Sequence, residues 1–113
     1  ADPARGAKVI ALASLAGVYP EAGLAAYGAT KAALLSLIDT LNAEESGSGI
    51  TGTAIAPGYV DTDMSAWIAD RIPPDTMIAV NDLVELVDGV LRMSPRAVVS
   101  RIVVTRAGAG LGA

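Results

Sequence analysis

Short apolar runs alternate along this chain with longer segments in which apolar residues recur at helical spacing. Residues 7–14 form a continuous apolar run, which is typical of a strand buried on both faces. From Ala25 to Glu45 the apolar residues follow the i, i+3, i+4, i+7 spacing of a helix, and the SGSG sequence that follows predicts its end. Residues 50–56 predict a second strand, which Pro57 and Gly58 terminate.

The remainder of the chain repeats this alternation. Asn81 is the predicted N-cap of a helix that ends before Pro95, and residues 97–105 form a third run rich in β-branched residues. Helices that link successive strands imply parallel pairing, so the sequence predicts an α/β fold of order β-α-β-α-β. A doubly wound nucleotide-binding domain contains two such halves. We therefore expect residues 1–113 to be a segment of a larger Rossmann-type domain.

Composition and charge narrow the chemistry. The 113 residues include no Cys and no His, which excludes a disulfide, a thiolate nucleophile and the usual zinc sites. Asp61 and Asp63 have no third ligand nearby, so we expect solvated turn carboxylates and no metal site. The net charge is −4 without any Lys/Arg cluster, which makes nucleic acid and anionic membranes poor partners. With no membrane-spanning run and no signal peptide, we expect a cytoplasmic protein.

Tyr27 and Lys31 lie four residues apart in the first predicted helix, so their side chains share one face. An ammonium beside a phenol favours the phenolate form, which would make the tyrosine a usable acid–base group near neutral pH. A pair at this spacing also arises by chance about once in twenty such chains. A lysine that merely extends past a half-buried tyrosine is the alternative, and the pair alone leaves both open.

Two further motifs accompany this pair. Ser14 stands in the sequence SLAG, thirteen residues before Tyr27, and PGYVDT occupies residues 57–62. Together with the YGATK sequence that contains Lys31, these motifs resemble the short-chain dehydrogenase/reductase family in order and spacing. The resemblance covers almost the whole chain but only the C-terminal half of the family's domain. The family's glycine-rich loop, its residue that selects NAD or NADP, its N-A-G motif and its helix asparagine are missing.

The resemblance implies a role for each matched residue. Ser14 would bind the carbonyl or alcohol oxygen of a small-molecule substrate, Tyr27 would transfer a proton, and Lys31 would favour the phenolate and hold the nicotinamide ribose. The cofactor would be NAD or NADP, contacted by Tyr27, Lys31, Pro57, Gly58, Val60 and Thr62. Because the pyrophosphate-binding loop is missing, we expect incomplete cofactor binding and little or no activity from the isolated chain.

Residues 63–80 correspond to the family's substrate-covering segment. Their apolar residues are spaced like one face of a short helix, namely Met64, Trp67, Ile68 and Ile72. This spacing predicts either an apolar lid, in which Met64 and Trp67 contact an apolar alcohol or ketone, or a structural helix docked on the body.

The helix Ala25–Glu45 has an alanine-rich side in addition to its leucine stripe. The stripe contains Leu34, Leu37, Ile38 and Leu41, and the small side contains Ala26, Ala29 and Ala33. Small residues permit close helix approach, and the family commonly packs this helix against its equivalent, so the resemblance implies a homo-oligomer. A different class of function remains: a non-catalytic interaction or structural module derived from the family. The joint presence of Ser14, Tyr27 and Lys31 favours the enzyme.

Overall fold

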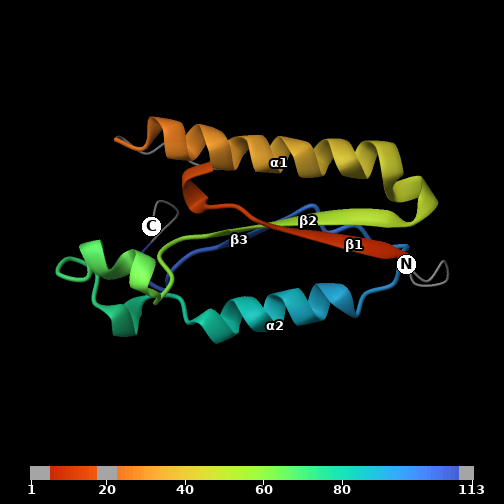
Figure 1. The fold of residues 1–113 in the computed structure, drawn as a ribbon. Helices are drawn as coiled ribbons and strands as arrows, with labels where there is room; N and C mark the ends of the chain where they lie inside the picture. The colour runs from red at the N-terminus through yellow and green to blue at the C-terminus, as the bar shows by residue number, and fades with distance from the viewer. Residues whose placement is uncertain (1–5, 18–22, 110–113) are drawn as a thin grey trace.

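The computed structural model describes residues 6–17 and 23–109 as a parallel sheet with a helix on each face (Figure 1). The sheet order is β1-β2-β3, and both pairings are parallel. The regular elements are β1 (Ala7–Leu12), α1 (Ala25–Glu45), β2 (Ile50–Pro57), α2 (Val80–Leu91) and β3 (Arg101–Val104). Four short 3₁₀ helices join them: η1 (Leu15–Gly17), η2 (Ser46–Ser48), η3 (Asp63–Ile68) and η4 (Pro74–Thr76). The predicted α/β fold is therefore confirmed.

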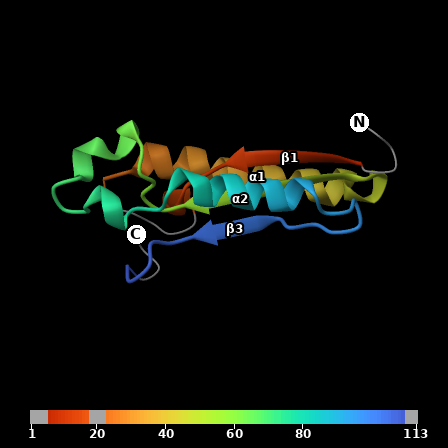
Figure 2. The same ribbon diagram turned by 90° about the horizontal axis from the view of Figure 1, so that it is seen from below.

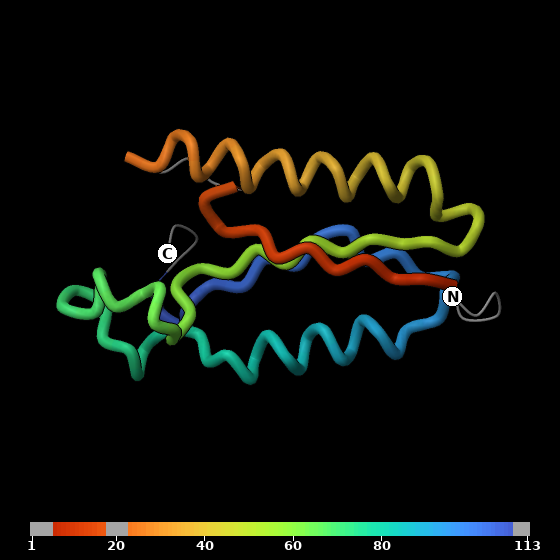
Figure 3. Tube along the Cα trace, viewed as in Figure 1, coloured from red at the N-terminus to blue at the C-terminus, as the bar shows by residue number. Residues whose placement is uncertain are grey.

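The strands share one direction, so their carboxyl ends meet at one edge of the sheet. Figure 3 shows that the segment containing η3 and η4 lies at that same end of the molecule. Helix α1 covers one face of the sheet, and Figure 2, which is seen from below, shows α2 across the middle of the other face. This arrangement gathers the loops that follow β1 and β2, where ligands bind in open parallel sheets.

The core lies between α1 and the central strand β2. Ala54, Ile55 and Ala56 of β2 are at most 1% exposed, because the strand is paired on both edges and covered by helices on both faces. Leu35 and Ile38 of α1 pack into this core. Of the predicted leucine stripe, Ile38 and Leu41 pack at the core, but Leu37 is 63% exposed. The buried residues of α1 are Leu35, Ile38 and Asn42, a spacing that also defines one helical face.

An amide side chain from α1 completes the hydrogen bonding of β2. Asn42 Oδ1 accepts the backbone N–H of Gly52 at 2.7 Å, and Asn42 Nδ2 donates to the Gly52 carbonyl at 3.0 Å. Two residues further along β2, the N–H of Ala54 donates to the carbonyl of Ser100 beside β3. Asn42 therefore takes the place that an earlier residue of β3 would occupy. This explains why the third strand begins at Arg101 and not at residue 97 as predicted.

Two other predicted boundaries differ from the structure. The first strand ends at Leu12, short of residue 14, because the chain turns into η1, whose Gly17 N–H donates to the Ser14 carbonyl. The second long helix begins at Val80, and its N-cap is Ala79, not Asn81. The carboxylate of Asp82 accepts the Ala79 N–H at 3.1 Å and so satisfies the start of the helix. The predicted bounds of α1 are confirmed at both ends.

The apolar residues of η3 do not share one face, contrary to the prediction. Met64 is 83% exposed and Trp67 is 64% exposed, whereas Ile68 is buried at 6%. A 3₁₀ helix places residues three apart on one side, so Met64 and Trp67 project together while Ile68 turns to the body. Within the described part of the chain, no helix is long and apolar enough to cross a membrane.

Candidate functional site

A pocket of about 330 Å³ opens at the carboxyl ends of β1 and β2. Three of the predicted catalytic and cofactor residues line it: Ser14, Tyr27 and Gly58. Met64 and Trp67, the predicted substrate contacts, also line it, and Leu15, Ala16, Leu24, Tyr59 and Ser65 complete the described lining. The structure therefore brings together residues from four separate segments that the sequence motifs had only related by order.

Ser14 reaches the pocket from the turn that follows β1. The N–H of the preceding residue, Ala13, donates to the Ile55 carbonyl at 2.8 Å. This bond holds Ala13 against β2 just beyond the end of β1. The Ser14 Oγ accepts the N–H of Ala16 at 3.2 Å. Because Oγ acts as an acceptor toward its own turn, its O–H hydrogen is left to donate to a molecule in the pocket.

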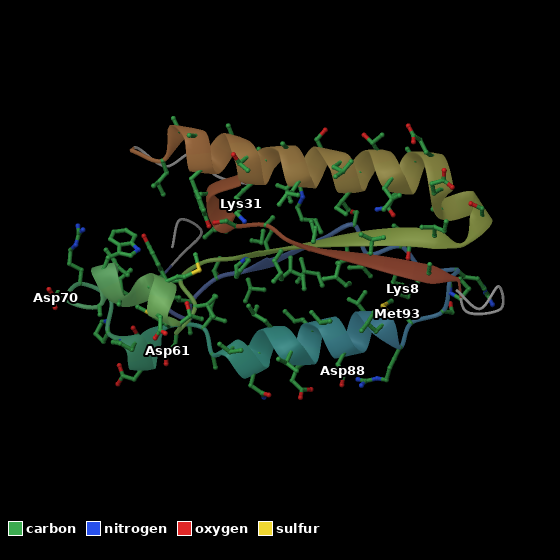
Figure 4. The ribbon with its side chains drawn as sticks, viewed as in Figure 1. Lys8, Lys31, Asp61, Asp70, Asp88 and Met93 are labelled. Carbon is green, nitrogen blue, oxygen red and sulfur yellow. The ribbon has the colours of Figure 1, made fainter. Side chains whose placement is uncertain are left out.

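Tyr27 projects from the first turn of α1, and its side chain is partly exposed at the pocket. The Nζ atom of Lys31 lies 5.6 Å from the centre of the Tyr27 ring, as expected for residues one turn apart. The same Nζ donates to the Leu12 carbonyl at 3.5 Å, and Figure 4 shows Lys31 reaching from α1 toward the end of β1. Lys31 thus stands behind the tyrosine and does not line the pocket itself.

Two glycines allow the Ser14 turn to approach α1 closely. A Cβ atom at Gly17 would lie 2.9 Å from the backbone nitrogen of Ala32 and from the carbonyl carbon of Lys31. A Cβ atom at Gly28 would lie 3.1 Å from the Ala16 carbonyl oxygen. Glycine at residue 28 lowers helix propensity, but here it provides room for η1 against the first turns of α1. The close contact places Ser14 and Tyr27 beside the same pocket.

The PGYVDT turn contributes only part of its predicted residues to the pocket. Gly58 lines it and donates its N–H to the Val104 carbonyl at 2.9 Å, but Pro57, Val60 and Thr62 do not line it. The following backbone pairs with Ile78, which donates to the Tyr59 carbonyl and accepts from Asp61, each at 2.9 Å. These bonds tie residues 59 and 61 of the turn to Ile78.

Two polar pocket residues, Tyr59 and Ser65, were not among the predicted site residues. The Tyr59 ring meets Trp67 edge-on, with the ring centres 6.1 Å apart and an angle of 67° between the planes. Ser65 is buried at 9% beside the exposed Met64. Tyr59 lies inside the PGYVDT motif, so this motif could have identified it as a site residue. No sequence signal indicated Ser65, because its position depends on the 3₁₀ geometry of η3.

Comparison with known proteins identifies the family of the chain. The model of the short chain dehydrogenase family matches residues 2–72. A 2,3-dihydro-2,3-dihydroxybenzoate dehydrogenase of Escherichia coli (strain K12) is 43% identical over 68 residues, which cover 58% of this chain and 27% of that protein.

Solved structures show the same fold. A betaketoacyl-ACP reductase from Bacteroides thetaiotaomicron superposes with a TM-score of 0.72 at 30% identity, over 88% of this chain and 40% of that one. A 4-hydroxyisoleucine dehydrogenase complexed with NADH superposes with a TM-score of 0.78 at 22% identity, over 88% of this chain and 45% of that one. The chain spans about a quarter of the length of the Escherichia coli relative. With its family match, its motifs and its fold in agreement, the chain belongs to the short-chain dehydrogenase/reductase family.

Proposed function

We propose that this chain carries the acid–base part of an NAD(P)-dependent oxidoreductase that interconverts an alcohol and a ketone or aldehyde. One observation carries the proposal: Ser14 and Tyr27 line the same pocket, and the ammonium of Lys31 lies over the Tyr27 ring. The family membership of the chain supports the same reaction class. Because the chain spans only part of its relatives, the proposal concerns the whole protein that contains it.

The pocket residues have distinct roles in the proposed reaction. When an alcohol is oxidised, the Tyr27 phenolate accepts the hydroxyl proton, and the Lys31 ammonium stabilises that phenolate. Ser14 donates its free O–H hydrogen to the substrate oxygen and so stabilises the negative charge that develops there. The nicotinamide ring, when bound, would accept the hydride from the alcohol carbon. In the reverse direction Tyr27 protonates the oxygen of the reduced carbonyl.

The described residues fit the nicotinamide end of NAD or NADP. Lys31 makes one described hydrogen bond, to the Leu12 carbonyl, which leaves ammonium N–H groups for the hydroxyls of a ribose. We assign the contacts of the nicotinamide ring and carboxamide to the turn formed by Pro57, Gly58, Val60 and Thr62, three of which lie outside the substrate pocket. The 4-hydroxyisoleucine dehydrogenase that shares this fold was solved with NADH.

The chain represents, in this proposal, the C-terminal half of a Rossmann-type domain. The described helices that follow strands β1 and β2 do not begin with a glycine-rich loop, so a pyrophosphate has no cradle of backbone N–H groups within residues 6–17 and 23–109. We therefore expect the 113-residue chain alone to be inactive or nearly so. We also propose that the whole protein forms a homo-oligomer through α1.

Steady-state kinetics of the whole protein tests the reaction class. We expect oxidation of secondary alcohols with NAD or NADP, followed through the absorbance of the reduced nicotinamide. Tyr27→Phe removes the proton carrier and should lower kcat by roughly 10²–10⁴-fold. Ser100→Ala, at an exposed residue just before β3, is the control and should leave kcat unchanged. Full activity of Tyr27→Phe would refute the proposal.

A further inference from the structure

The described lining of the pocket contains polar groups but no charged side chain. Its polar side chains are two serines, Ser14 and Ser65, and two tyrosines, Tyr27 and Tyr59; the other described lining residues are glycine or apolar. A carboxylate or phosphate that entered this pocket would lose its water without gaining a cation partner from the described lining. The chemistry of the lining therefore favours a neutral molecule.

The charges nearest to η3 strengthen this preference. Three exposed carboxylates, those of Asp61, Asp63 and Asp70, lie in or beside η3, and Figure 4 shows Asp61 and Asp70 at this end of the molecule. They outnumber the one exposed guanidinium beside them, that of Arg71, so the net charge of residues 61–71 is negative and opposes the approach of anions. Lys31 does not reverse this effect, because it lies behind the Tyr27 ring and donates to the Leu12 carbonyl.

Ser65 differs from Ser14 in having an unused hydroxyl. Its backbone N–H donates to the Thr62 carbonyl at 3.0 Å, but its side-chain hydroxyl makes no hydrogen bond within the described residues. The residue is only 9% exposed and lines the pocket. Its oxygen is not among the fully buried unpaired side-chain atoms of the described residues, so it is accessible from the pocket. A molecule in the pocket can therefore hydrogen-bond to it.

The two serines reach the pocket from different segments. Ser14 follows β1, whereas Ser65 belongs to η3 after β2. A substrate held at its reacting oxygen by Ser14 and Tyr27 can therefore present a second oxygen to Ser65. The apolar remainder of the lining, which includes Leu24, Met64 and Trp67, would cover the carbon skeleton between the two oxygens.

We propose that the pocket binds a neutral, largely apolar alcohol or ketone that carries a second hydroxyl or carbonyl oxygen, and that Ser65 hydrogen-bonds this second oxygen. The inference rests on the proposed function for the reacting oxygen. It assigns to Ser65 a specificity-determining role, in which the residue selects the substrate and takes no part in proton transfer.

The fluorescence of Trp67 provides a direct binding test. Trp67 is the single tryptophan of the chain, lines the pocket and meets the Tyr59 ring, so its emission reports on pocket occupancy. The probes are cyclohexanol, cyclohexanecarboxylate, and cyclohexanediols with hydroxyls on adjacent or on opposite ring carbons. We expect at least one diol to bind about three- to tenfold more tightly than cyclohexanol, the effect of one hydrogen bond. The carboxylate should bind more weakly than cyclohexanol.

Variants separate a role of Ser65 from general effects on the fold. Ser65→Ala should bring the affinity for the diol to that for cyclohexanol, and Ser65→Thr, which keeps the hydroxyl, should retain the preference. Ser100→Ala, at an exposed serine just before β3 and outside the pocket, is the matched control. Circular dichroism of each variant checks that it is folded.

The results of this binding test are independent of the kinetic test of the proposed reaction. A diol preference that survives Ser65→Ala, the absence of any diol preference, or a carboxylate that binds as tightly as cyclohexanol would overturn this inference. Because the binding test needs no hydride transfer, it gives its result even if the whole protein proves to have no oxidoreductase activity. Loss of the preference in Ser65→Ala alone would support the role of Ser65.

Discussion

The Nζ atom of Lys31 lies 5.6 Å from the centre of the Tyr27 ring while it donates a hydrogen bond to the carbonyl of Leu12. One side chain of α1 is thereby held against the end of β1. The position of the ammonium beside the tyrosine depends on the packing of α1 against the strand and on helical spacing together. Sites built on helices and strands are more precise than sites built on loops.

Replacement of Lys31 should therefore lower activity of the whole protein by two routes. Lys31→Met keeps much of the apolar stem but removes the charge that stabilises the Tyr27 phenolate and the donor to Leu12. We expect kcat to fall by about 10²-fold or more. Lys31→Arg keeps a positive charge in a different geometry and should retain part of the activity. Equal activity of Lys31→Met and the unmodified protein would contradict this role.

Gly17 should be sensitive to the smallest possible side chain. A methyl group there would lie 2.9 Å from two backbone atoms of α1, so η1 must move away from the helix. We expect Gly17→Ala to lower the free energy of unfolding by roughly 1–3 kcal/mol, which urea denaturation measures. The same movement displaces the turn that carries Ser14, so kcat of the whole protein should fall as well.

Gly89 of α2 provides the matched glycine control. A Cβ atom at this residue would meet no atom within 4 Å. Gly89→Ala should therefore raise the free energy of unfolding by about 0.4–1 kcal/mol, because alanine reduces the entropy of the unfolded chain in a helical position. If both variants changed stability in the same direction, the close approach of η1 to α1 would not explain Gly17.

Asn42 should matter more for stability than the ion pair that Asp39 of the same helix makes with Arg101 of β3. Asn42→Ala leaves the N–H and C=O of the buried Gly52 without partners, at a cost of roughly 2–4 kcal/mol in the free energy of unfolding. Asp39 and Arg101 lie 3.6 Å apart, but both are more than one-third exposed. Asp39→Ala should change stability by less than about 1 kcal/mol. Urea denaturation of both variants compares them directly, and equal losses would contradict the role of Asn42.

Prediction from the sequence succeeded where the signals are local. The bounds of α1 were predicted correctly because helical spacing begins at Ala25 and a serine- and glycine-rich sequence follows Glu45. The start of β3 was wrong because it depends on Asn42, a side chain far away in the sequence that occupies the edge of β2. The sequence around β3 contains no sign that a side chain of α1 occupies this edge of β2.

For the pocket, too, prediction succeeded for residues in local motifs and failed for a residue whose position depends on the three-dimensional structure. Ser14, Tyr27 and Gly58 were predicted from motifs that stand at the ends of strands and the start of a helix, and the structure places all three in the lining. Ser65 was missed because η3 is a 3₁₀ helix, and apolar spacing was interpreted as α-helical. The roles assigned to these residues stay predictions.

Cofactor binding by the 113-residue chain alone should be weak. The described residues offer donors for a ribose but no cradle for a pyrophosphate after β1 or β2. Titration of the chain with NADH and with NADPH, followed through nicotinamide fluorescence, should show no saturation below the millimolar range. Sub-millimolar binding by this chain would contradict the division of the cofactor site that we propose.

The outer side of α1 is the surface through which we expect the whole protein to assemble. From Ala25 to Leu37 its exposed residues are alanine, threonine, serine, leucine and the partly exposed Tyr27, without a charged side chain among them. Leu37, at the C-terminal end of this surface, is 63% exposed. An apolar, small-residue helix face without charge is suited to close packing against a second helix.

A charge introduced at this surface should therefore dissociate the assembly. Leu37→Glu would place carboxylates near one another at a helix–helix contact between copies, where desolvation and repulsion both oppose association. Val84→Glu on α2 is the control, since Val84 is similarly exposed at 53% but lies on the opposite face of the sheet. Size-exclusion chromatography with light scattering should show a smaller species for Leu37→Glu alone. Dissociation by Val84→Glu but not by Leu37→Glu would contradict an interface on α1 and would indicate one on α2.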